Sequence, residues 1–251
     1  MEEKNEKLPG DVKLKSPLFE KLDNFWYHYK WHTIVTLFVI IVGIILTVQT
    51  CSRVETDVYV MYAGPHTVSR IAKDGNLSEY ENAVSSLKKI SSDYTDDGII
   101  TISFVDLFVV NSEEAEKILA DNPGKEINSA LVKENTDTLH QKLLFGEYYL
   151  CFLSERIFKE YEEEYGEAMF APLAPYGKAG TEYEYASERG IYLRSLPFSA
   201  SPEICELPDD TVVCLRRFSE VAETFGRSDN EENFKRGEEM MKKLLAYGIK
   251  E

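Results

Sequence analysis

Residues Thr33–Thr50 read TIVTLFVIIVGIILTVQT, and no Asp, Glu, Lys or Arg occurs between Lys30 and Arg53. A helix rises about 1.5 Å per residue, so roughly 20 apolar residues cross a hydrocarbon core about 30 Å thick. A helix also satisfies its backbone polar groups within the segment, as lipid requires. This stretch therefore predicts a single N-terminal transmembrane helix, and the rest of the chain is organised on either side of it.

An aromatic cluster directly precedes the apolar run. Residues 25–32 read FWYHYKWH. Trp and Tyr rings favour the headgroup level of a membrane because it accommodates an apolar ring together with a polar edge. We therefore assign residues 25–51 to an aromatic belt followed by the transmembrane helix. Residues 1–24 are polar and carry Pro-Gly and Ser-Pro breakers, which predicts a short tail.

The Lys and Arg residues near the run predict its orientation, because cytoplasmic flanks carry the excess of positive charge. Four lysines precede the run and two arginines follow it in a comparable window; these are Lys13, Lys15, Lys21 and Lys30, and then Arg53 and Arg70. The bias predicts a cell-membrane protein with a cytoplasmic tail and an extracytoplasmic domain at residues 55–251. The long segment before the run and the lack of an A-x-A site after it favour an uncleaved signal anchor.

The acidic charge of the chain is concentrated in the predicted outer domain. The net charge is −16, and residues 1–51 hold six Lys against six Asp and Glu, so the whole excess lies after residue 51. An acidic domain repels phosphate backbones and anionic membrane surfaces. We therefore expect no nucleic-acid partner. An acidic surface is also an ordinary route to solubility.

Strand and helix patterns alternate through residues 55–251. Apolar, β-branched runs predict strands, and apolar residues at three- and four-residue spacing predict helices. The expected strands cover 57–63, 99–105, 147–153, 191–196 and 211–218; the expected helices follow residue 78, open at 111–114, and cover 127–145, 154–165 and 230–247. This alternation predicts a three-layer α/β domain with a mostly parallel sheet.

Two short segments follow predicted strands, where open α/β sheets bind their ligands. Gly64, Pro65 and His66 follow the first strand, and Ser154 and Glu155 follow the strand at 147–153. These five residues form the candidate ligand-binding set. For His66 the alternative interpretation is a solvated loop residue.

The turn DYTDDG at residues 93–98 partly matches a calcium-binding loop. Asp93, Thr95 and Asp97 occupy its first, third and fifth positions, and Gly98 occupies the sixth. Alternate positions bring oxygen atoms onto one hard cation. The twelfth position, where a bidentate Glu belongs, is Phe104, and a strand is expected where a helix should follow. The two interpretations are a weak Ca²⁺ loop and a polar helix-to-strand turn, and no other cofactor is expected.

The four cysteines include no CxxC and no Cys/His cluster with zinc spacing. Cys151 lies in the apolar run YYLCFL and is expected in the core. Cys205 and Cys214 flank a turn-bearing segment and are candidates for a disulfide, which needs an oxidising compartment. The alternative is a pair of reduced core thiols.

The cluster FWYHYKWH with the span after it, the strand ending Tyr62-Ala63-Gly64 and the Asp-rich turn at 93–98 resemble a family of uncharacterised single-pass membrane proteins of Gram-positive anaerobic bacteria. Turns of that family often read D-x-N-x-D-G, and Thr95 stands in the Asn position here. The stretch LLFGEYYL at 143–150 is similar to part of the extracellular solute-binding proteins. The resemblance implies a related α/β fold and brings no catalytic residue with it.

Two functions are consistent with these features. The first is a membrane-tethered extracytoplasmic binding or interaction module with a small-molecule or protein partner, because an anchor precedes a compact domain without a G-x-S-x-G, H-E-x-x-H or phosphate-loop motif. The second is an extracytoplasmic hydrolase that uses carboxylates such as Asp93, Asp97 or Asp106. No spacing singles out a catalytic pair.

Overall fold

The computed structural model describes residues 17–51, 55–72, 77–124, 126–177, 182–200, 207–218 and 230–248. The chain divides into two units, Met1–Val54 and Glu55–Glu251. We call the second unit the α/β domain.

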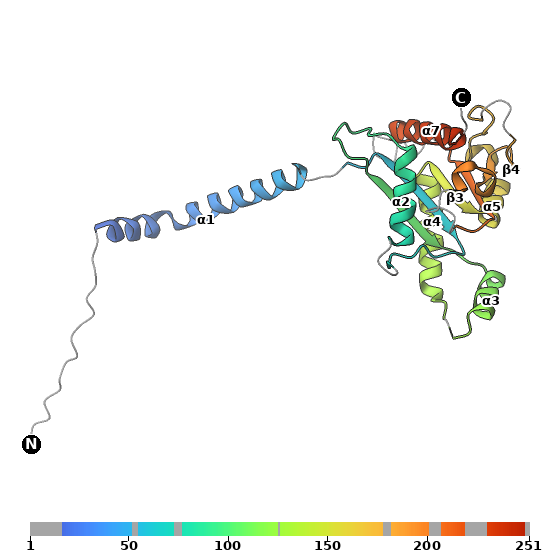
Figure 1. Cartoon of the computed structure of the whole chain (residues 1–251). Helices are drawn as coiled ribbons and strands as arrows, with labels where there is room; N and C mark the ends of the chain where they lie inside the picture. The colour runs from blue at the N-terminus through green and yellow to red at the C-terminus, as the bar shows by residue number, and fades with distance from the viewer. Residues whose placement is uncertain are drawn as a thin grey trace, which may run out of the picture. The chain divides into compact units, whose positions relative to one another are not determined.

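The first unit contains a long helix, α1, which covers Pro17–Cys51 (Figure 1). Within it, Phe25–Ile45 is long and apolar enough to cross a membrane, the only such segment among the residues that the structure describes. Its side chains are not buried by other parts of the chain. The helix is compatible with the predicted membrane anchor, and equally with a signal sequence.

One six-stranded sheet forms the centre of the α/β domain, in the order β2-β1-β3-β6-β5-β4. The strands are β1 (Val58–Gly64), β2 (Ile102–Phe108), β3 (Leu150–Ser154), β4 (Tyr185–Ser187), β5 (Gly190–Tyr192) and β6 (Thr211–Leu215). Strand β1 pairs in parallel with β2 and β3, whereas the pairs β3–β6, β6–β5 and β5–β4 are antiparallel.

The prediction of a mostly parallel sheet is therefore wrong. Parallel pairing is confined to β2, β1 and β3, whose connections contain helices. After β3 and α5, β4 and β5 form a hairpin with register partners Ser187 and Gly190, and antiparallel neighbours need only such a short turn. The domain is nevertheless an α/β domain with a mixed sheet.

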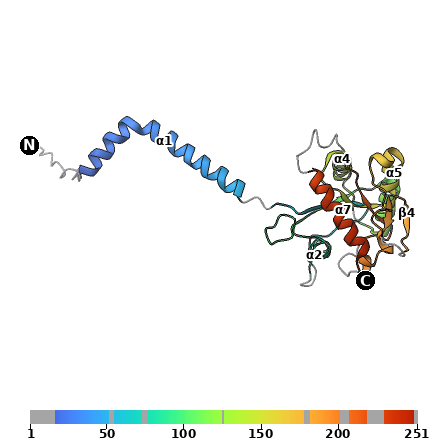
Figure 2. The ribbon, with the colours of Figure 1, turned by 90° about the horizontal axis from the view of Figure 1, so that it is seen from above.

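Helices contribute to the core on both faces of the sheet. They are α2 (Glu79–Ile90), α3 (Ser112–Asp121), α4 (Ser129–Phe145), α5 (Glu155–Tyr165) and α7 (Asn230–Ala246), with the short 3₁₀ turns η1 (Gly166–Ala168), η2 (Leu193–Ser195) and η3 (Pro197–Ala200). Figure 2 shows α7 running across the domain, with α2 beside it. Helix α3 buries none of its residues.

Alternation along the strands creates two hydrophobic clusters, because successive strand side chains point to opposite faces. Tyr62 and Phe152 belong to the first cluster, to which α2 and α7 contribute. Met61 and Cys151 belong to the second, to which α4 and α5 contribute. Because β1 and β3 are parallel, their carboxyl ends lie at the same edge of the sheet.

The predicted helix starts agree with the local hydrogen bonds. Ser78 and Glu81 form a capping box at α2. Asn111 and Glu114 form another at α3, which confirms the helix start predicted at 111–114. Ser154 occupies the N-cap position of α5, as expected, but its side chain makes no capping hydrogen bond.

Candidate functional site

The carboxyl edge of the parallel strands brings together Gly64 and Ser154 from the predicted ligand-binding set. Ala63 and Leu153 are register partners of β1 and β3, so the next residues of the two strands are neighbours. A Cβ atom placed on Gly64 would lie 3.3 Å from the Cβ atom of Ser154. Pro65 forms the bend that leads away from β1.

Tyr62 extends over Gly64 toward the same edge. A Cβ atom on Gly64 would lie only 2.6 Å from the Tyr62 hydroxyl oxygen, so glycine at this position makes room for the phenol. The backbone N–H of His66 donates to that oxygen at 3.4 Å, and the two rings meet edge to face with centroids 6.4 Å apart. The residue that sequence reasoning missed is thus the tyrosine beside the predicted Gly64 and His66.

The Tyr62 phenol remains protonated at physiological pH. Burial raises its pKa well above the usual range; the N–H of His66 opposes this shift, and the charges of Asp210, Glu114 and Asp106 add to it. The hydroxyl can therefore donate a hydrogen bond. Of the three carboxylates, Asp106 pairs with Arg70 and Glu114 pairs with Arg156, each at 2.9 Å.

Ser154 and Thr211 face each other across β3 and β6 as register partners. Ser154 is 1% exposed and Thr211 0% exposed. Within the part of the chain that the structure describes, neither side-chain oxygen has a hydrogen-bond partner. By strand alternation both side chains lie on the face that carries Tyr62. Three hydroxyl groups therefore gather on one face at this edge.

His66 also approaches this region with a buried ring nitrogen. Its Nε2 lies 3.4 Å from Oε2 of Glu79. The same Glu79 oxygen accepts from the backbone N–H of Ser69 at 2.8 Å. The imidazole therefore faces a carboxylate that is already fixed by the backbone.

Glu155 and Asp210 lie at the start of α5 and just before β6, and the N–H of Glu155 donates to the carbonyl of Asp210 at 3.0 Å. A hydrogen bond from Lys159, supported by one of 2.7 Å from Tyr192, lowers the pKa of Glu155. Burial, with the charges of Glu155 and Glu114, raises the pKa of Asp210, and Arg194 opposes the shift. Two neighbouring carboxyl groups therefore differ in acidity.

The Asp-rich turn at 93–98 is closed by its own side chains. Asp93 accepts from the N–H of Gly98 at 2.8 Å and from the Thr95 hydroxyl at 3.3 Å. Asp97 accepts from the N–H of Ile99 at 2.8 Å. Among the described residues, no group of three or more His, Cys, Asp or Glu side chains is arranged to hold a metal ion. The Ca²⁺ site at Asp93, Thr95 and Asp97 stays a prediction.

The predicted disulfide involves Cys205, which lies outside the described residues. Cys214 is buried and carries a free thiol in the structure. Cys151 is likewise buried and free, as expected of a core residue.

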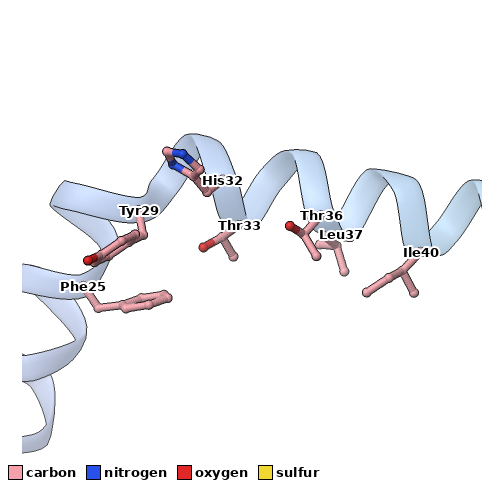
Figure 3. Close-up of a pocket in the computed structure, with 7 residues that line it drawn as sticks. All are labelled: Phe25, Tyr29, His32, Thr33, Thr36, Leu37 and Ile40. Carbon is pink, nitrogen blue, oxygen red and sulfur yellow. The ribbon is translucent and has the colours of Figure 1, made fainter.

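A separate hollow lies on α1, at the aromatic belt and the start of the apolar run. Figure 3 shows its lining residues, Phe25, Tyr29, His32, Thr33, Thr36, Leu37 and Ile40. The rings of Phe25 and Tyr29 stack there with centroids 5.2 Å apart. All seven lining residues belong to this one helix.

No protein-family model, curated protein or solved structure matches this chain. The resemblance to the single-pass membrane family and to solute-binding proteins therefore stays a prediction, and the carboxyl edge itself is the basis for inferring a function.

Proposed function

We propose that this chain is a membrane-tethered extracytoplasmic binding module whose ligand occupies the carboxyl edge of β1 and β3. One observation carries the proposal: the hydroxyls of Ser154 and Thr211 are buried and unpartnered among the described residues. A buried polar group without a partner costs about 1–3 kcal/mol. A ligand that hydrogen-bonds to both hydroxyls would recover that free energy.

The chemistry of the edge limits the ligand class. Tyr62, Ser154 and Thr211 offer neutral hydroxyls. Neutral hydroxyls pair with hydroxyl, amide or carbonyl groups of a ligand. The ligand is therefore a neutral, hydroxyl- or amide-bearing small molecule or peptide segment.

A ligand screen by thermal unfolding tests this proposal. The full chain in detergent is melted with sugars, amino acids, short peptides and metal ions, and a ligand of the folded state raises the midpoint. Ser154→Ala and Thr211→Val should abolish the shift, whereas the exposed Ser112→Ala should keep it. A shift that survives both edge substitutions places the ligand elsewhere. An unchanged midpoint with every compound excludes these compounds as ligands, and a protein partner is then the remaining candidate.

The topology is part of the proposal. The Lys bias places the tail of residues 1–24 in the cytoplasm and residues 55–251 outside, with helices on both faces of the sheet forming a three-layer domain. Protease added to intact cells should then digest the α/β domain and leave the membrane helix. If the domain survives until the cells are lysed, the orientation is wrong.

A hydrolase is the second candidate, and the difference in acidity between Glu155 and Asp210 favours it. Pairs of carboxyl groups with pKa values pushed apart serve as base and acid in hydrolases. Of the acids expected from the sequence, Asp106 is bonded to Arg70 at 2.9 Å, and Asp93 and Asp97 close the turn. Hydrolysis of chromogenic esters, glycosides or peptides that is lost in Asp210→Asn would support this function, and activity retained in that variant would exclude this pair.

A further inference from the structure

The junction between the parallel and antiparallel halves of the sheet contains a pair of cysteines. Strands β3 and β6 form this junction, and Cys151 and Cys214 are direct register partners across it. Both side chains belong to the second hydrophobic cluster, so both lie on the same face of the sheet. Each is 0% exposed.

The two sulfur atoms lie in one small environment. The thiol of Cys214 lies 3.7 Å from the carbonyl oxygen of Cys151. The thiol of Cys151 lies 3.7 Å from the carbonyl oxygen of Tyr148 and 3.8 Å from that of Tyr149. Burial raises the pKa of Cys214, and the neighbouring Cys151 raises it further.

The strand geometry permits a covalent bond between these cysteines. The Arg216 N–H donates to the Tyr149 carbonyl at 2.8 Å, so Cys151 and Cys214, two residues away on each strand, also form a hydrogen-bonded pair. The Cα atoms of such a pair are about 5.5 Å apart, and disulfides span Cα separations of about 4.4–6.8 Å. The Cβ atoms of such a pair are about 5.5 Å apart, against about 3.5–4.5 Å in a disulfide, so the strands must approach locally. We propose that Cys151 and Cys214 form a disulfide that links the two halves of the sheet.

The reaction is a two-electron thiol–disulfide exchange. The thiolate of one cysteine attacks a disulfide donor, either a small-molecule disulfide or a thiol oxidase, and forms a mixed disulfide. The second thiolate displaces the donor, so the protein loses two hydrogens and the donor leaves as two thiols. Because buried thiols with a raised pKa react poorly, the bond forms before the two strands are covered. In cells this requires an oxidising compartment, as outside the membrane.

This pairing and the one expected from the sequence exclude each other, because both use Cys214. The structure places Cys151, 63 residues away along the chain, directly opposite Cys214. Peptide mapping therefore distinguishes the two pairings.

The test refolds the full chain in detergent from reduced, denatured protein in a mixture of oxidised and reduced glutathione. Free thiols are then alkylated, and the chain is digested without reductant for mass spectrometry. The expected product is a linked peptide pair containing Cys151 and Cys214, with two of the four cysteines alkylated. A peptide pair containing Cys205 and Cys214, or alkylation of all four cysteines, overturns the proposal.

Two variants complete the test. Cys205→Ala should keep the linked pair, and its unfolding midpoint should be higher in oxidised than in reduced protein. Cys151→Ala should lose that difference between oxidised and reduced protein. If Cys151→Ala does not fold, the Cys205→Ala variant still decides the matter, because equal midpoints before and after reduction would contradict the bond.

Discussion

The carboxylate of Asp57 accepts a hydrogen bond of 2.7 Å from the backbone N–H of Thr101, just before β2. The same carboxylate accepts from the N–H groups of Tyr94 and Thr95 at 2.7 and 3.0 Å. Asp57 is 0% exposed. One buried side chain at the start of β1 therefore holds the Asp-rich turn in place.

Replacing Asp57 should destabilise the α/β domain strongly. Hydrogen bonds to a charged group contribute about 1.5–3 kcal/mol each, and Asp57→Ala would leave three N–H groups without their acceptor. We expect the free energy of unfolding to fall by at least about 3 kcal/mol in denaturant titrations of the full chain. The exposed Glu116→Ala is the matched control and should change it by less than about 0.5 kcal/mol. Equal effects of the two substitutions would contradict this role.

The calcium prediction can be decided by melting the chain with millimolar Ca²⁺ and then with chelator. Asp93 and Asp97 already accept backbone N–H groups of the turn, so we expect the same midpoint in both conditions. Asp97→Ala should lower the midpoint equally in both, because it removes the bond to Ile99. A midpoint raised by Ca²⁺ in the wild type but not in Asp97→Ala would establish the calcium loop instead.

Arg216 caps the carboxyl end of α4 from inside the protein. Its guanidinium donates to the carbonyl of Leu143 at 3.1 Å, to that of Tyr148 at 3.2 Å, and to that of Gly146. It also stacks over the ring of Tyr149 at 4.3 Å. Burial lowers its pKa. A cation at the carboxyl end of a helix is favourable because the helix dipole is negative there.

Arg216→Ala should therefore cost about 3–5 kcal/mol of unfolding free energy, because it leaves buried carbonyls unpaired and a cavity behind. Arg216→Lys should rescue little, since a single ammonium does not reproduce the planar fork that reaches three carbonyls. The neighbouring Arg217 is exposed and provides the control, Arg217→Ala. Denaturant midpoints measure all three variants. A lysine variant as stable as the wild type would show that charge alone suffices.

Gly64 and Tyr62 should be energetically coupled. In Gly64→Ala the new methyl would lie 2.6 Å from the Tyr62 hydroxyl and 3.1 Å from its Cζ, and overpacking of this kind costs about 1–3 kcal/mol. Removing the hydroxyl in Tyr62→Phe should relieve part of the clash, so the double variant loses less than the sum of the single losses. A double-mutant cycle by denaturant unfolding measures the coupling. If the stability losses of the two single variants simply add, the backbone at position 64, and not the Tyr62 phenol, is what requires glycine.

Local features of the fold were predictable because their partners are close in sequence. Ser78 and Glu81, three residues apart, form the capping box of α2. The predicted neighbours Gly64 and Ser154 meet because the carboxyl ends of parallel strands share an edge.

Nonlocal features were not predictable from periodicity. Thr211 opens a strand that runs antiparallel to β3, so its amino end lies at the carboxyl edge of the parallel strands. Only the residues that follow each predicted strand were candidates for ligand binding, so Thr211, which begins a strand, was not among them. Asp57 is an acid just before an apolar run, and its partners lie 37 to 44 residues further along the chain. The burial of Asp57 indicates its structural role, and the sequence alone does not show that burial.

Asp210 makes the stability of the domain depend on pH. Burial, followed by the charges of Glu155 and Glu114, raises its pKa above the ordinary value of 3.8 in the folded protein. A group whose pKa is raised on folding binds its proton more tightly in the folded state, so its contribution to stability is present below about pH 4 and is lost as the pH rises through the folded-state value.

Asp210→Asn should remove the loss of stability that accompanies ionisation of Asp210, because the amide carries no charge. The variant should be more stable than the wild type at pH 7, and the difference should shrink as the pH falls toward 4. Denaturant unfolding across that range measures it, with the exposed neighbour Asp209→Asn as the matched control. An Asp210→Asn variant less stable than the wild type at neutral pH would mean that the folded state binds the ionised carboxylate favourably, so that desolvation does not dominate at this edge.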